Sequence, residues 1–119
     1  MAVRTFRDLL VWQRAIQLAT AVYRLTSAFP KEEIYGLTGQ MRRAAVSAGS
    51  NIAEGQGRLT TGEFRHFLGM ARGSNLELQT QIEVARALKF GDAGLLKEVE
   101  ELSFEVGKMI NGLLAKTKS

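Results

Sequence analysis

The sequence contains no cysteine, one proline and one histidine among its 119 residues. The lack of cysteine excludes disulfides and thiolate metal sites and is consistent with a reducing compartment. No run of about eighteen apolar residues is present, and the N-terminal segment lacks the apolar stretch of a signal peptide. We therefore expect a cytoplasmic protein that does not interact with a membrane.

The residues that are present indicate one globular domain with an uneven distribution of charge. Apolar residues make up 45% of the chain and charged residues 24%, and the net charge is +4. Residues 1–90 carry 12 lysines and arginines against 7 acids, and residues 91–119 carry 4 against 5. Such a basic body can attract nucleic acid or another polyanion, although +4 also suffices to keep a small domain soluble.

Four amphipathic segments with short connections predict one all-α domain over residues 1–119, an antiparallel up-down-up-down four-helix bundle. The expected helices cover residues 8–28, 37–54, 61–88 and 92–115. Asp8 and Asp92 are placed to cap the first and last helix, and Thr60 with Glu63 forms a capping box. Gly55-Gln56-Gly57 is expected to end the second helix in a left-handed conformation.

The second helix is unusual because small residues occupy most of its circumference. Its apolar stripe runs from Leu37 to Ile52, and a separate line contains Arg42, Val46, Gly49 and Ala53. Other backbones can therefore approach it on more than one side, which indicates either the most enclosed helix of the fold or a helix that also contacts another subunit. In the third helix, Gly69 and Gly73 likewise permit a close helix contact.

Motifs for catalysis are incomplete. Glu63 and His66 form a Glu-x-x-His motif, but a di-iron bundle needs a second such motif and two further carboxylates. The segment Gly55–Arg58 lacks the Gly-Lys-Ser/Thr of a phosphate-binding loop. We see no serine–histidine arrangement, and there is no cysteine nucleophile. The sequence therefore predicts a protein that is not an enzyme and that holds no metal or cofactor.

Arginines and a few polar residues are the remaining candidates for a functional site. The candidate nucleic-acid-binding residues are Arg42, Arg43, Arg58, Arg65 and Arg72. The alternative for Arg42 and Arg43 is pairing with Glu54, Glu77 or Glu83 across helices, or with another subunit. The residues expected to be structural or to lie at an interface are Asn51, Glu54, Asn75, Glu77, Gln81 and the outward-facing Phe104. Asn75 lies on the apolar arc and needs a partner if buried, whereas Glu77 and Gln81 lie off that arc.

Three segments carry a resemblance to a known family: FRDLLVWQRA at 6–15, YGLTGQMRRAAVSAGSNIAEGQGR at 35–58 and GSNLELQTQIEVA at 73–85. The chain resembles the four-helix-bundle proteins encoded in intervening sequences of bacterial 23S ribosomal RNA genes, often labelled S23 ribosomal proteins. It departs from their pattern at Ser47-Ala48-Gly49-Ser50, where Ser-Ile-Pro-Ser or a similar string is common.

The resemblance implies a small bundle that assembles as a closed homopentamer and has no established enzymatic activity. A similar bundle is the accessory protein of diversity-generating retroelement reverse transcriptases, where a basic pentamer works with nucleic acid. By that analogy of fold and charge, we expect a homo-oligomer that binds RNA or DNA without strong sequence preference. The alternative is a protein-interaction scaffold that does not bind nucleic acid directly.

Overall fold

The computed structural model describes residues 5–118 and confirms the prediction of four α-helices. No strand occurs in this part of the chain. The elements in order are the 3-10 helix η1 (Phe6–Asp8), α1 (Leu10–Thr26), the 3-10 helix η2 (Lys31–Glu33), α2 (Leu37–Gln56), α3 (Thr61–Leu88) and α4 (Ala93–Lys116).

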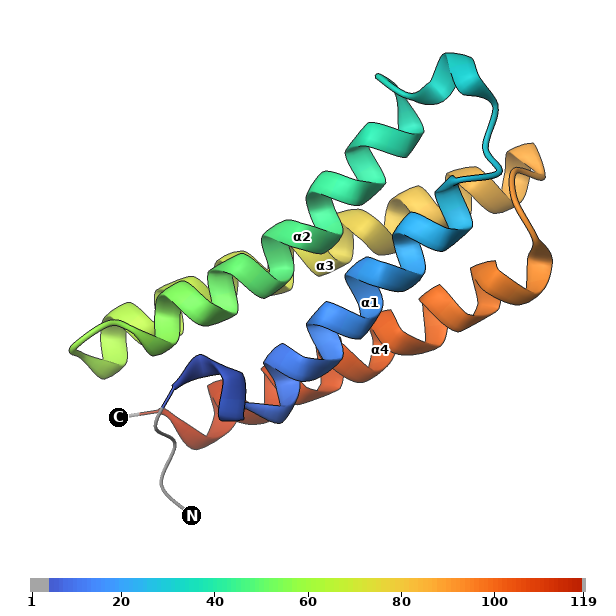
Figure 1. Ribbon diagram of the computed structural model, residues 1–119. Coiled ribbons are helices and arrows are strands. Elements are labelled where there is room, and N and C mark those ends of the chain that lie inside the picture. Colours follow the sequence, from blue (N-terminus) through green and yellow to red (C-terminus); the bar gives the residue numbers. More distant parts are fainter. Residues whose placement is uncertain (1–4, 119) are drawn as a thin grey trace.

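Consecutive helices run antiparallel and form a rod of 44 × 23 × 21 Å (Figure 1). Between α3 and α4, Arg86 contacts Glu100 near one end, and Arg65 contacts Leu114 at the other. We call the end that contains the α2–α3 turn, residues 57–60, the hairpin end. Because the number of helices is even, both ends of the described chain also lie there (Figure 1).

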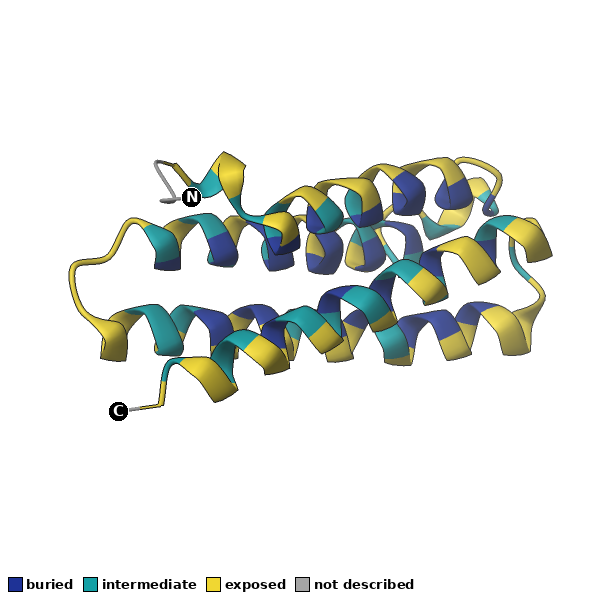
Figure 2. Cartoon of the chain, turned by 90° about the horizontal axis from the view of Figure 1, so that it is seen from below, coloured by how far each residue is buried: buried dark blue, intermediate teal, exposed yellow. Residues whose placement is uncertain are grey.

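The core runs along the whole bundle axis and contains one buried stripe from each helix (Figure 2). The predicted stripe of α2 is confirmed, since Met41, Ala44, Ala45, Ala48 and Ile52 are all buried. The largest side chains that are completely buried include one from each helix: Leu18, Met41, Leu78 and Ile110. Each side chain of this size stabilises the fold by about 1.5–3 kcal/mol when it leaves water.

The start of the first helix differs from the prediction. Asp8 does not cap α1; its carboxylate accepts from the backbone N–H of Thr5 at 3.2 Å and completes a capping box around η1. Leu9 precedes α1 and provides no side-chain cap, and α1 ends at Thr26. Asp8 binds Thr5 rather than the first turn of α1 because the Thr5 hydroxyl also accepts from the Arg7 N–H, so that two backbone donors of the turn are satisfied together.

The predicted left-handed stop after α2 is also wrong. The helix continues through Gly55 to Gln56, and Gly57 has a right-handed φ of −80°. Gly55 is glycine because α3 packs against it, since an added Cβ would lie 2.8 Å from the Cβ of Phe67. The left-handed residues are Lys89 and Gly91, in the α3–α4 turn.

The N-caps of the last two helices are confirmed, but the predicted capping box of Thr60 and Glu63 is incomplete because the Glu63 carboxylate accepts from the Thr60 hydroxyl and not from its backbone N–H. Thr60 accepts from the Glu63 N–H at 3.1 Å, and Asp92 accepts from the Leu95 N–H at 2.9 Å. Each bond satisfies a backbone donor that the first turn of a helix leaves without an intrahelical partner. The turns at both ends of α3 are therefore defined by local hydrogen bonding.

Candidate functional site

The two arginines in the first half of α2, Arg42 and Arg43, have different environments. Arg42 donates from Nε to the Thr26 hydroxyl at 2.9 Å, and its guanidinium lies 4.4 Å from the centre of the Tyr23 ring. These contacts join α2 to the end of α1. Arg43 is exposed and makes no hydrogen bond or ion pair with any residue of 5–118. Neither arginine pairs with Glu54, Glu77 or Glu83 in this chain.

Arg58 lies in the turn at the hairpin end. Its guanidinium pairs with Glu54 at 3.0 Å and lies 4.6 Å from the centre of the Phe67 ring. Glu54 therefore neutralises Arg58 rather than an arginine earlier in α2. Because both members of the pair are substantially exposed, the pair contributes at most about 1 kcal/mol to stability.

Arg65 and Arg72 lie along the contact between α3 and α4, and each donates to a neutral oxygen. Arg65 donates from Nη1 to the carbonyl of Leu114 and to the hydroxyl of Thr117, where its charge also complements the C-terminal dipole of α4. Arg72 donates from Nε to Oδ1 of Asn111 at 3.0 Å. Both arginines thus have partners without losing their net positive charge.

Arg86, farther along the same side of α3, is different. Glu83 and Glu100 accept from its guanidinium at 2.8 and 2.9 Å, and these hydrogen bonds raise the pKa of Arg86. Two carboxylates next to one guanidinium leave this place with no excess positive charge. Along this side of α3, excess positive charge is therefore found only toward the hairpin end.

Folding separates the charges by their position along the rod. The half that includes the hairpin end consists of residues 5–18, 47–74 and 105–118, and we call it the basic half. It carries eight lysines and arginines against four acids, whereas residues 19–46 and 75–104 carry seven against eight. The net charge of the described residues is therefore +4 in the basic half and −1 in the other half. This separation of charge is not visible in the linear sequence, because each helix crosses both halves.

Asn75 forms the hydrogen bonds that its place on the apolar arc requires. It donates to the Ser103 carbonyl at 2.9 Å and accepts from the Ser103 hydroxyl at 2.8 Å. Gln79 donates to the same hydroxyl at 3.0 Å. Asn51 similarly donates to the Ser47 carbonyl at 2.9 Å, next to a hydroxyl–hydroxyl bond between Ser47 and Ser74. The bonds of Asn75 and the Ser47–Ser74 bond connect helices, whereas the bond of Asn51 lies within α2.

Gln81 corrects one of our predictions, because it lies in the interior rather than off the core arc. Its exposed fraction is 7%, and its Oε1 accepts no hydrogen bond from the described residues. Gln81 follows Ser74 by seven residues, on the side of α3 that contacts α2. The small residues of α2 allow the two helices to approach closely enough to cover that side. Glu77 is exposed, as expected.

An apolar groove follows the outer side of α1 and α2. It has a volume of about 250 Å³ and is lined by Phe6, Trp12, Ala15, Ile16, Ala19, Ala45, Val46, Gly49, Ser50 and Ala53. Three members of the predicted small-residue line of α2, Val46, Gly49 and Ala53, lie in this lining. Val46 is 45% exposed, so the chain itself does not enclose this side of α2.

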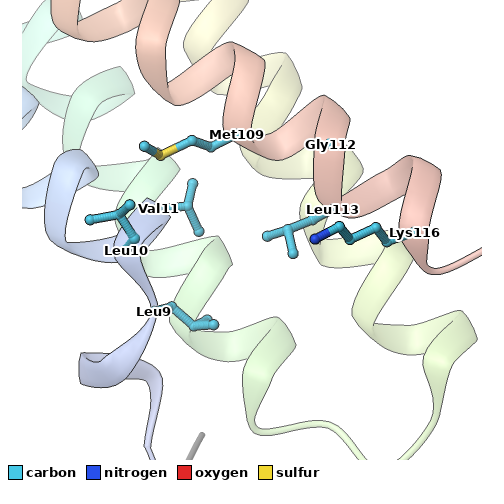
Figure 3. A pocket seen from close by; sticks show the side chains of 7 residues that line it. All are labelled: Leu9, Leu10, Val11, Met109, Gly112, Leu113 and Lys116. Carbon is cyan, nitrogen blue, oxygen red and sulfur yellow. The ribbon is translucent and has the colours of Figure 1, made fainter. Parts of the chain in front are cut away.

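A second apolar cleft, of about 310 Å³, opens between the start of α1 and the end of α4 (Figure 3). Its lining consists of Leu9, Leu10, Val11, Met109, Gly112, Leu113 and Lys116. Apart from the amine of Lys116, these seven residues supply no side chain for acid–base or nucleophilic chemistry. We assign no catalytic role to this cleft.

The Glu-x-x-His motif lies on the surface of α3. Glu63 accepts a hydrogen bond from the Thr60 hydroxyl at 3.2 Å, and the ring of His66 packs edge-on against Phe67. Within residues 5–118, no three histidine, aspartate or glutamate side chains come close enough together to hold a metal ion. No helix in this range has the length and hydropathy needed to cross a membrane.

Comparison with known families agrees with the motifs and the fold. The family model for the 23S rRNA-intervening sequence protein matches residues 7–112. The chain belongs to this family. The chain also resembles a solved structure, a protein of unknown function from the S23 ribosomal protein family of Bacteroides thetaiotaomicron VPI-5482, with a TM-score of 0.78. The match has 16% identity and covers 88% of this chain and 98% of the other, so it supports the fold alone. Comparison with curated proteins gave no match.

Proposed function

We propose that this protein is a non-enzymatic homo-oligomer, assembled as a pentamer, that binds RNA or DNA through its basic half. The charge separation along the rod, +4 against −1, carries the proposal. In a ring whose subunits point the same way, the basic halves gather on one face, and their potentials add. Contacts with phosphates are independent of sequence, which fits a protein without strong sequence preference.

Arg72, Arg65 and Lys108 are the residues that this proposal places on phosphates. Arg65 and Arg72 are separated by two helical turns, about 10 Å, on the same side of α3. Lys108 precedes the Arg72 partner Asn111 by three residues, so it lies near Arg72 on the surface of α4. The sequence reasoning missed Lys108 because only folding brings it next to α3. Arg42 and Arg43 lie outside the basic half, and Arg58 shares its charge with Glu54.

The test is a fluorescence-anisotropy titration of labelled structured RNA and duplex DNA at about 50 and 200 mM salt. The double variant Arg72→Gln/Lys108→Gln should bind more weakly, and its slope of log affinity against log salt should fall by about 2. The matched control, Lys89→Gln/Lys97→Gln, removes the same charge from the other half and should change neither quantity. Equal effects of the two double variants would contradict the proposed site, and salt-independent binding or no binding at low salt would contradict the proposed function.

A protein-interaction scaffold is the second candidate function. The exposed Phe104 on α4, 54% accessible, and the apolar cleft at the hairpin end favour it. Capture of a defined protein on the immobilised oligomer after nuclease treatment, and loss of that capture in Phe104→Ser, would support this candidate. Capture that disappears with nuclease treatment would instead indicate that nucleic acid links the two proteins.

A further inference from the structure

The outer face of α3 carries apolar side chains that are partly exposed to solvent. Met70, Leu76 and Val84 are each 43–46% exposed. A Cβ added at Gly69 or Gly73 would meet no atom within 4 Å. Each glycine inside a helix costs about 1 kcal/mol relative to alanine, and here no packing within the chain offsets that cost. The face therefore has the composition of a close helix contact that this chain alone does not make.

One carboxylate without a partner lies on this face. Glu77 is exposed and makes no hydrogen bond or ion pair with the described residues. It follows Gly73 by four residues, which places it one turn farther along the same side of the helix. The outer face of α3 thus combines apolar side chains, two open glycines and one unpaired negative charge.

The groove on the outer side of α1 and α2 has complementary properties. Its lining comes from η1, α1 and α2 and is almost entirely apolar. Arg43 lies three residues before Val46, and Arg42 lies four residues before it. Neither arginine has a carboxylate partner in the described chain, so the groove combines apolar surface with positive charge at one end.

We propose that the outer face of α3 docks into the α1–α2 groove of a second copy of this chain. In an antiparallel arrangement that places Glu77 beside Arg43 of the second copy, Gly73 lies near its Val46 and Gly69 near its Ser50. The spacings agree, since the eight residue steps from Gly69 to Glu77 span about 12 Å and the seven steps from Arg43 to Ser50 about 10 Å. The open glycines let the two backbones approach, and the ion pair determines the register.

This contact joins two different surfaces, so every copy offers one of each to its neighbours. Repetition of such a heterologous contact gives a closed ring if the rotation returns to the start, and a filament if it does not. The inference rests on the self-association in the proposed function. It specifies the surfaces that meet and does not require nucleic acid to be present.

Engineered cysteines can test the contact without background because the chain contains none. Val46→Cys and Gly73→Cys are purified separately, one with a size tag, treated with nuclease, mixed and oxidised. The control replaces Gly73→Cys with Gly112→Cys on α4, where an added Cβ also meets no atom within 4 Å. A disulfide requires Cα atoms within about 7 Å, so only adjacent positions should react efficiently.

The expected result is a mixed disulfide between Val46→Cys and Gly73→Cys, with a yield at least about tenfold above that of the Gly112→Cys control. Neither variant alone should give a comparable yield of dimer. Disulfide formation by Gly73→Cys alone would show that α3 pairs with itself and would overturn the proposal. A yield equal to that of the control would do the same.

A second measurement covers the case in which a cysteine at position 73 disturbs the contact. Gly73→Leu should lower the association constant at least about tenfold by sedimentation, because a bulky side chain keeps the helices apart. Gly112→Leu is the control, and both variants should keep the helical circular dichroism of the original chain. Unchanged association in Gly73→Leu would overturn the proposal. Anisotropy titrations of the original chain separately report on nucleic-acid binding, so failure of one proposal is distinguishable from failure of the other.

Discussion

Replacement of Asn75 by alanine should destabilise the bundle more than any change to the exposed arginine contacts. Asn75 is 2% exposed and Ser103 is completely buried, and two hydrogen bonds connect them across the α3–α4 contact. Asn75→Ala removes both bonds. The Ser103 hydroxyl keeps the bond from Gln79 but loses the acceptor for its own proton, in a part of the core that water does not reach.

The magnitude follows from the environment of the two groups. A buried polar group without a partner costs about 1–3 kcal/mol, and the space left by the amide adds a cavity cost. We therefore expect the free energy of unfolding to fall by about 2–4 kcal/mol. Asn111→Ala is the control, because that asparagine is exposed and its bond to Arg72 should contribute less than about 1 kcal/mol.

Urea unfolding followed by circular dichroism measures both values. With a slope of about 2 kcal/mol/M, Asn75→Ala should lower the midpoint by roughly 1–2 M. The measurement is repeated at several protein concentrations, because self-association raises the apparent stability. The double variant with Ser103→Ala should recover part of the loss, since it removes the hydroxyl that lacks an acceptor. A loss below about 0.5 kcal/mol, or an equal loss in Asn111→Ala, would refute this account of the core.

Three further predictions concern glycines, arginines and the subunit contact. Gly55→Ala should lower the free energy of unfolding by about 1–3 kcal/mol in urea, because the added methyl group meets Phe67. Gly69→Ala should raise the free energy of unfolding of the monomer by up to about 1 kcal/mol. A change of the same sign in both variants would contradict the packing described. Arg65→Met should lower the free energy of unfolding by about 1 kcal/mol, because hydrogen bonds at the end of α4 are lost. Arg43→Met loses no hydrogen bond or ion pair within the described chain and should lower it by less than about 0.5 kcal/mol in the same assay. Glu77→Arg and Arg43→Glu should each weaken self-association, measured by sedimentation. The double variant should recover it, because the exchanged charges can pair again. Additive losses in the double variant would show that the two residues do not pair.

The number and direction of the helices could be predicted because the apolar stripes repeat with helical period and the connections are short. Thr60 and Asp92 were correctly identified as caps, since each begins a helix with no competing residue upstream. Asp8 was not, because Thr5, three residues earlier, forms a separate turn with it. Glycine spacing alone could not distinguish a helix stop from close packing, so the role of Gly55 became visible only with Phe67 beside it.

The environments of the candidate site residues were less predictable than the fold. Whether Gln81 is buried depends on how closely α2 approaches the flank of α3, which no periodicity within α3 specifies. The arginine partners depend on which neighbouring helix each side chain faces, and on which atom that helix offers at the same level. Arg86 meets carboxylates there, whereas Arg65 and Arg72 meet neutral oxygens. The basic half is likewise a property of folded geometry, because its residues come from three separate stretches of the chain.

Both ends of the described chain, residues 5 and 118, lie at the hairpin end, which has a practical consequence for binding experiments. Residues 5 and 118 belong to the half of the rod that carries the excess positive charge (Figure 1), and Thr117, next to Lys118, accepts a hydrogen bond from Arg65. An affinity tag at either terminus would therefore sit beside the surface proposed to meet phosphates. A polyhistidine tag would add positive charge there in mildly acidic buffer, and an acidic tag would compete for the arginines. Purification handles are better inserted in the α1–α2 connection around Lys31, at the opposite end, or removed before any titration.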